Sequence, residues 1–225
     1  MHAVKATTIN DAWHQAVYLC WRHGIDHKID KGSYEGQVRR QFDFFACEIA
    51  CPETRPLAIQ FPETMKVPPP NNDEQINDYA ANYLLSDVTS AKETYTYGSR
   101  MLAFPNPDGS VTNQVDWVIE HLKKYPGNNH CAITIPLGGD LILSHAPCLR
   151  QVDLKILDGK LNLTVYFRSW DLWSGFPTNL GGFQIFNEFI AQEIGVPTGK
   201  MFAASAGLHL YEMYFEVVKA RFGVE

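Results

Sequence analysis

Residues 146–179 read APCLRQVDLKILDGKLNLTVYFRSWDLWSGFPTN, and they contain the clearest folding signal of the chain. Apolar side chains alternate with polar ones on both sides of Asp158-Gly159 (Val152, Leu154 and Ile156 before it; Leu161, Leu163, Val165 and Phe167 after it). Such alternation is typical of strands with one buried face, and an Asp-Gly pair between two such runs is a strong hairpin signal. The sequence therefore predicts two antiparallel strands joined at Asp158-Gly159.

Helical and strand-like segments alternate on either side of this hairpin. Apolar spacing and capping residues predict helices at 8–23, at 113–124, at 180–194, and from a cap at Asn72 or Asp73 through a buried stripe ending at Leu84. Strands are expected at 130–137, near 200–211 and within 42–67, with a short helix at 212–221 and a loop over 25–41. The pattern predicts an α+β fold: a single domain over residues 1–225, with a mixed, largely antiparallel sheet packed against several helices.

Composition narrows the classes of protein that this chain can represent. It has 225 residues, with 19 Lys and Arg against 25 Asp and Glu, a net charge of −6. This balance argues against a general nucleic-acid binder or a basic membrane-surface protein. Apolar runs fall short of a membrane span, and the N-terminus lacks a signal-peptide pattern. Five scattered cysteines are typical of a reducing compartment, so we expect a cytoplasmic protein.

Two residues of the quoted stretch carry candidate chemistry. Cys148 follows a proline just before a strand, and Arg168 ends an otherwise apolar strand. A guanidinium there is costly unless an anion meets it, and a nearby Arg favours the nucleophilic thiolate of a cysteine. The alternative is a surface salt bridge between Arg168 and Asp171. Both interpretations are compatible with the spacing.

Other patterns carry less chemistry. Cys20, His23 and His27 have a spacing that suggests a metal, but Cys20 falls on an apolar helix face and no second ligand pair follows, so we expect no metal. The Gly pairs at 138–139 and 181–182 lack the residues of a phosphate loop or a dinucleotide fingerprint, so ATP- or NAD-type chemistry has no support.

The second half of the chain resembles the thymidylate synthase family, which includes pyrimidine-nucleotide hydroxymethylases. The resemblance is carried by APC at 146–148, DGKL at 158–161, RSWD at 168–171, GFPTN at 175–179 and HLY at 209–211, with a weaker match from Tyr97-Gly98 onward. The interval from Cys148 to Arg168 matches the family without a gap. The short chain, with only residues 212–225 after Tyr211, and the Cys-Leu pair at 148–149 are most similar to compact archaeal-type members.

The resemblance implies reductive methylation of dUMP to dTMP, in which Cys148 adds to carbon 6 of the pyrimidine. The one-carbon donor would be a reduced pterin, either 5,10-methylenetetrahydrofolate or methylenetetrahydromethanopterin. By the same resemblance, Arg168 and Ser169 would bind the phosphate and Asn179 the uracil edge. His209 and Tyr211 would contact the sugar, Asp171 the pterin, and Tyr97 would belong to the proton-transfer network. Taken alone, His209 and Tyr211 could be the polar face of a strand, and Asn179 a helix N-cap.

Several positions depart from the family pattern. Leu149 replaces the usual His, Gly207 replaces an Asp, and Asn129 and His130 stand where the family has arginines that a partner subunit lends to the phosphate. A homodimer is expected from the family, but without those arginines a monomer is also compatible. Lys28, Arg39 and Arg40 are candidates for the missing positive charge, and Asp78, Glu63 and Glu93 are candidates for the general base.

Two other functions remain compatible with the sequence. The first is a hydroxymethylase acting on dCMP, CMP or dUMP, which releases the one-carbon adduct with water and without hydride transfer. The second is a catalytically silent nucleotide-binding homologue. Asn179 favours uracil over cytosine, because an amide both accepts and donates hydrogen bonds.

Overall fold

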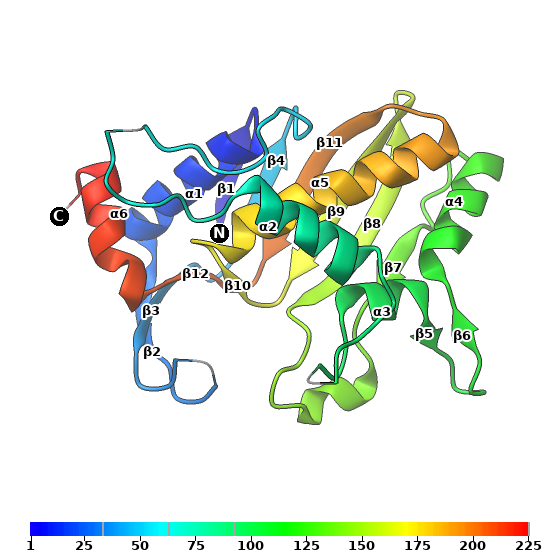
Figure 1. Ribbon diagram of the computed structural model, residues 1–225, viewed down its shortest axis with the longest axis horizontal. Helices are drawn as coiled ribbons and strands as arrows, with labels where there is room; N and C mark the ends of the chain where they lie inside the picture. Colours follow the sequence, from blue (N-terminus) through cyan, green and yellow to red (C-terminus); the bar gives the residue numbers. More distant parts are fainter. Residues whose placement is uncertain (33, 63, 92, 225) are drawn as a thin grey trace.

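A six-stranded mixed sheet forms the centre of the computed structural model, which describes residues 1–32, 34–62, 64–91 and 93–224 (Figure 1). Its strand order is β1-β4-β11-β9-β8-β7. β1 runs parallel to β4, and β11 runs parallel to β9, whereas the other neighbours are antiparallel. The strands span His2–Ala6 (β1), Phe45–Ile49 (β4), Ala132–Thr134 (β7), Leu149–Leu157 (β8), Lys160–Phe167 (β9) and Thr198–Ser205 (β11).

Two smaller sheets complete the strand inventory of the described residues. A four-stranded sheet has the order β10-β12-β3-β2, and a two-stranded sheet pairs β5 with β6. Their strands are Ile25–Lys28 (β2), Val38–Gln41 (β3), Phe104–Pro105 (β5), Val111–Thr112 (β6), Trp170–Asp171 (β10) and Leu208–Tyr211 (β12). β10 directly follows the long hairpin, so the smaller four-stranded sheet begins where the hairpin ends.

Helices cover one face of the six-stranded sheet, with α5 lying across its middle strands and α2 in front of α5 (Figure 1). The α-helices span Ile9–His23 (α1), Asp73–Asp78 (α2), Tyr97–Leu102 (α3), Gln114–Lys124 (α4), Gly175–Ile194 (α5) and Phe215–Phe222 (α6). A π-helix continues α2 (η1, Tyr79–Leu84), and 3-10 turns occupy Gly138–Ile142 (η2) and Glu212–Tyr214 (η3). No helix of the described part of the chain is long and apolar enough to cross a membrane.

The predicted hairpin and the predicted α+β fold are confirmed. β8 and β9 pair from Leu149↔Phe167 to Leu157↔Lys160. Asp158 and Gly159 both have positive φ, 51° and 72°, the backbone that a two-residue hairpin turn requires and that Asp and Gly tolerate. Helix α1 begins as predicted, with the Thr8 hydroxyl accepting from the Asp11 N–H at 3.1 Å.

Three sequence predictions are wrong in their bounds. The helix predicted at 180–194 begins at Gly175, because Pro177 is compatible with a first helical turn. The strand near 200–211 is two strands, β11 and β12, which belong to different sheets. The loop over 25–41 contains β2 and β3, whose side chains are exposed or half-buried and so lack an apolar signal.

Side chains of the six-stranded sheet alternate between a buried and an open side. The helix-covered side holds the core, which includes residues from every strand of the sheet and from α1, α4 and α5. The other side carries half-buried Ala46, Thr164, Tyr166, Phe202 and Ala204, which we call the open face. Register places these residues beside one another across β4, β11 and β9.

Candidate active site

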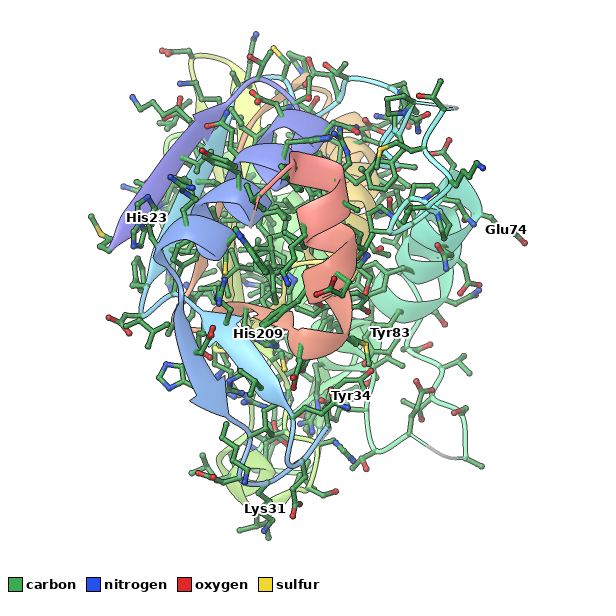
Figure 2. All side chains as sticks on the ribbon, turned by 90° about the vertical axis from the view of Figure 1, so that its left-hand side faces the viewer. His23, Lys31, Tyr34, Glu74, Tyr83 and His209 are labelled. Atoms are coloured by element: carbon green, nitrogen blue, oxygen red, sulfur yellow. The ribbon has the colours of Figure 1, made fainter. Side chains whose placement is uncertain are left out.

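A cavity of about 220 Å³ gathers the predicted site residues at the junction of the two larger sheets. Its wall contains all of them except Arg168, together with three residues that were not predicted: Tyr97, Cys148, Phe167, Ser169, Trp170, Asp171, Gly175, Asn179, His209 and Tyr211. They come from α3, the start of β8, the end of β9, β10, α5 and β12. Figure 2, seen from the side of α1 and α6, marks His209 in the densely packed middle of the molecule.

Cys148 lies half-buried immediately before β8 and lines the cavity. Burial raises the pKa of the Cys148 thiol, while the positive charges of Arg168 and then Arg150 act in the opposite direction. The backbone N–H of Arg168 donates to the Cys148 carbonyl at 2.9 Å, which fixes the loop against the end of β9. Cys148 is therefore a held, half-buried thiol; burial disfavours its thiolate, and the two nearby cations favour it.

Four tyrosines surround the thiol on the side of η1 and α3. The Tyr97 hydroxyl accepts from the Leu149 N–H at 3.2 Å, which places it beside Cys148. Tyr83 contacts Tyr97 edge-on, with ring centroids 5.1 Å apart, and Tyr79 stacks on Tyr83. Burial raises the pKa of Tyr95 to about 12 and that of Tyr97 well above its ordinary value, so these hydroxyls keep their protons. A protonated hydroxyl of this kind can donate to a reacting group.

Asn179 lies inside α5 and is not its N-cap, which corrects one of the two interpretations of this residue. Its Oδ1 accepts from Trp170 Nε1 at 2.8 Å. An indole N–H only donates, so this bond fixes which end of the amide is oxygen. The Tyr79 hydroxyl lies near the Asn179 side chain, so one amide hydrogen and one oxygen lone pair of Asn179 remain for a ligand with both an acceptor and a donor on one edge.

His209 is 2% exposed and presents an unused acceptor. Burial lowers its pKa, so the ring is neutral, and its Nδ1 contacts the Gly207 carbonyl at 2.8 Å, which assigns the proton to Nδ1. Its Nε2 is buried without a hydrogen-bond partner in the described structure. A buried, unpaired acceptor in a cavity wall is suited to a ligand hydroxyl. Burial also raises the pKa of neighbouring Tyr211 to about 12.

Arg168 and Asp171 do not form the alternative salt bridge. Arg168 donates from Nε to the Pro147 carbonyl at 3.0 Å and from Nη2 to the Ala146 carbonyl at 2.8 Å. Asp171 accepts from the N–H groups of Trp173, Ser174 and Gly175 and from the Ser174 hydroxyl. Arg168 therefore buttresses the Cys148 loop, and Asp171 organises the start of α5.

The remaining candidates are less well placed. Asp78 is exposed and accepts from Asn82, and Glu93 is exposed and accepts from Ser90, so neither lines the cavity; Glu63 lies outside the described residues. Arg40 is paired with Asp26 at 2.7 Å and covers the Trp21 ring, which leaves its charge unavailable.

Of the other two cationic candidates, Lys28 is exposed on β2. Arg39 lies opposite Tyr211 on the neighbouring strand, and its Nε is buried without a partner among the described residues. Asn129 and His130 are exposed before β7.

Cys20, the cysteine of the metal-like spacing, lies in the core. Burial raises the pKa of Cys20 to about 12, and its sulfur contacts the Arg40 carbonyl at 3.3 Å within the core. In the described parts of the chain, no group of three or more His, Cys, Asp or Glu side chains is arranged to hold a metal ion.

Sequence reasoning missed Trp170, Tyr79 and Arg150. Trp170 stacks on Phe167 at 3.9 Å and orients Asn179, yet in the sequence it is only one letter of RSWD. Tyr79 was predicted only as part of the buried stripe of the second helix. The presence of two hydroxyl-bearing residues, Tyr79 and Tyr83, on that stripe could have indicated a role in the site. Arg150 carried no signal, because nothing in the sequence shows that it turns toward Arg168.

Comparison with known proteins places the chain. A family model described as "Thymidylate synthase" matches residues 74–223. A protein from Methanosarcina barkeri named "Putative thymidylate synthase" is 31% identical over 219 residues, covering 96% of this chain and 92% of its own length. Proteins of the same name from Methanosarcina acetivorans and Methanococcoides burtonii are each 29% identical, over 96% and 93% of this chain. This chain belongs to the thymidylate synthase family.

Proposed function

We propose that the protein is a thymidylate synthase, a methyltransferase that converts dUMP to dTMP with Cys148 as the nucleophile. The observation that carries the proposal is the cavity in which Cys148 meets an oriented Asn179 amide and the unpaired His209 Nε2. These groups match, in order, the reacting ring, the uracil edge and a sugar hydroxyl of a pyrimidine deoxynucleotide. Family membership supplies the reaction class.

In the proposed reaction, the Cys148 thiolate adds to carbon 6 of the pyrimidine, and carbon 5 becomes nucleophilic. The charge that develops on the ring oxygen is stabilised by the Asn179 amide hydrogens. Carbon 5 then bonds to the one-carbon unit of the donor and loses its proton. The bond between that unit and the pterin breaks, hydride from the pterin reduces the exocyclic methylene to the methyl group, and Cys148 departs. Tyr97 lies beside the thiol and belongs to the proton-transfer path. Arg168 and Ser169 are assigned to the phosphate, and Tyr211 joins His209 at the sugar.

The family uses a methylene-folate-type co-substrate, and we propose that either a folate or a methanopterin donor serves here. Asp171 is the pterin contact that the resemblance implies, and it is the only carboxylate of the described residues in the cavity wall. Its oxygens already accept four hydrogen bonds from residues 173–175, so we assign it chiefly to shaping the floor on which the donor rests.

Assembly and location complete the proposal. We infer that residues 1–225 act as one domain in the cytoplasm and that two copies pair through the open face, where Phe202, Ala204 and Tyr166 leave partly uncovered apolar surface. Sedimentation of wild type and of Phe202→Lys tests this pairing. A dimer that becomes a monomer in the variant supports it, and a wild-type monomer contradicts it.

Covalent capture tests the nucleophile. Incubation with 5-fluoro-dUMP and each pterin should give wild type a mass increase that survives denaturation. Cys148→Ser should lose the adduct completely, while Cys51→Ser, which removes an exposed cysteine away from the cavity, should keep it. An adduct in Cys148→Ser, or none in wild type with either donor, contradicts the assignment.

Release of tritium from carbon 5 of labelled dUMP, with dCMP in parallel, separates the reaction classes. Pterin-dependent release from dUMP together with formation of dTMP supports the synthase. Faster release from dCMP, or a hydroxymethyl product, identifies a hydroxymethylase. Binding of dUMP without release with either donor identifies a silent homologue.

A further inference from the structure

A second cavity, of about 490 Å³, adjoins the cavity of Cys148. Its wall includes Arg150, Arg168, Tyr166, Ser144 and Asp140. The wall between the two cavities is formed by two short segments of chain. Ala146 and Arg168 line the second cavity, and Cys148 and Ser169 line the cavity of Cys148. Arg168 therefore lies between the two cavities, since it lines this one and its neighbour Ser169 lines the cavity of Cys148.

The two guanidinium groups in this cavity converge on one oxygen atom. The Pro147 carbonyl accepts from Arg168 Nε at 3.0 Å and from Arg150 Nη1 at 3.4 Å. Two groups that contact the same atom lie close together, so their positive charges repel each other.

This repulsion is not neutralised by a carboxylate. Within the described structure, neither Arg150 nor Arg168 takes part in an ion pair. The acidic residue of the cavity wall, Asp140, is paired with Arg100 at 2.8 Å and also accepts from the Leu137 N–H. The pair of arginines is thus a local excess of positive charge in a protein whose net charge is −6.

Backbone irregularity brings Arg150 to this place. In the pairing of β8 with β9, Leu149 faces Phe167 and Gln151 faces Tyr166, so Arg150 is the extra residue of a β-bulge. Bulges change the direction of a side chain and are frequent beside active sites. Without the bulge, Arg150 would follow the regular alternation of β8.

We propose that Arg150 and Arg168 together form an anion site for a phosphomonoester, and that Arg150 is a phosphate-binding residue of this chain. The proposal rests on the proposed function in taking that ester to be the 5′-phosphate of the nucleotide whose ring meets Cys148. Two adjacent guanidinium groups offer paired donors to phosphate oxygens, the geometry in which Arg binds phosphate most effectively. Arg150 then supplies from within the same chain a charge that Asn129 and His130 do not.

Calorimetric titration of the full-length protein with dUMP, deoxyuridine and inorganic phosphate tests the assignment. The variant is Arg150→Gln, and the matched control is Lys155→Gln, which removes one positive charge from the same strand but outside the cavity. Loss of one charge-assisted contact should weaken dUMP and phosphate about tenfold or more in Arg150→Gln, with deoxyuridine changed less than about twofold. All three ligands should bind Lys155→Gln within about twofold of wild type.

Equal dUMP affinity in Arg150→Gln and Lys155→Gln overturns the proposal. So does an equal loss for dUMP and deoxyuridine, since that pattern means that Arg150 only holds the Pro147 loop. If wild type binds phosphate in an Arg150-dependent manner but binds neither dUMP nor deoxyuridine, the anion site stands and the proposed function fails. No binding of either phosphate-bearing ligand by wild type overturns the anion site.

Arg150→Lys keeps the test valid if the Gln variant does not fold. Lysine retains the charge but not the paired donors, so the dUMP affinity of Arg150→Lys should lie between that of wild type and that expected for Arg150→Gln. In turnover assays the effect should appear in KM, with kcat nearly unchanged. A loss confined to kcat contradicts a phosphate-binding role.

Discussion

Asp171→Ala should destabilise the whole protein, because this carboxylate is the acceptor on which α5 begins. Its Oδ2 accepts from the Ser174 N–H at 3.2 Å, the Gly175 N–H at 3.1 Å and the Ser174 hydroxyl at 2.6 Å, and its Oδ1 accepts from the Trp173 N–H at 3.0 Å. Alanine removes these acceptors. The freed N–H groups then lie at a half-buried helix end with restricted access to water.

The expected cost follows from these contacts. Loss of an N-terminal capping side chain costs roughly 0.5–2 kcal/mol, and the lost interaction of a negative charge with the helix dipole adds about 0.3–1 kcal/mol. We therefore expect about 2 kcal/mol in the free energy of unfolding. For a chain of this size, that corresponds to a fall in Tm of about 4–8 °C.

Urea and thermal unfolding of Asp171→Ala and Asp171→Asn measure this cost. Asparagine keeps one oxygen acceptor and the shape of the side chain, so Asp171→Asn should lose about half as much stability as Asp171→Ala. Unfolding midpoints for Asp171→Ala that equal those of wild type would refute the capping role. Pterin affinity is measured on the same variants. If Asp171 has only a structural role, the affinity should change only as much as the movement of α5 requires.

Three further outcomes follow from the packing and the charges. Gly182→Ala should destabilise by about 1–3 kcal/mol in urea unfolding, because its new Cβ would clash with the Tyr79 ring. Gly139→Ala, whose new Cβ would meet nothing within 4 Å, should be nearly neutral, and equal midpoints for the two variants would contradict the clash. Arg100→Met should lower the free energy of unfolding by about 3–5 kcal/mol, because the Asp140 carboxylate, whose side chain is 5% exposed, loses its ion-pair partner. A decrease below about 1 kcal/mol in urea unfolding would contradict a desolvated pair. Burial lowers the pKa of His14, whose Nε2 contacts Arg221 at 2.8 Å, so the folded state favours the neutral ring. The contribution of His14 to stability is therefore present above pH 6.5, its ordinary pKa, and should be lost as the pH falls below that value. The Tm of wild type should then fall more on acidification than the Tm of His14→Gln, and parallel profiles of Tm against pH would contradict the effect.

Local chemistry was predictable from the sequence, and long-range pairing was not. The Asp158-Gly159 turn and the helix caps depend on residues within a few positions: the turn and the Thr8 cap form as predicted, and Asn72 is the cap of the two candidates, Asn72 and Asp73. The start of α5 was misplaced, because its acceptor, Asp171, lies in a strand before the helix. β1 and β3 escaped prediction because they pair with the distant strands β4 and β12, and β2, which pairs with nearby β3, has only exposed side chains.

The candidate site shows the same division. The family resemblance predicted seven of the ten residues that line the cavity, because it assigns positions without needing contacts; Phe167, Trp170 and Gly175 were missed. It could not predict that Arg40 is engaged by Asp26, since two adjacent arginines in β3 read identically. It also could not predict Arg150, whose direction depends on a bulge in the pairing of two strands.

The position of β11 inside the six-stranded sheet has a consequence for the order of folding. β11 lies between β4 and β9, so residues near the end of the chain are hydrogen-bonded to residues 45–49 near its beginning. During synthesis, β1 and β4 cannot join the β7-β8-β9 segment until β11 has left the ribosome. Until then two strands expose unpaired edges, a state prone to aggregation, and the cavity of Cys148 has no β12 to close it.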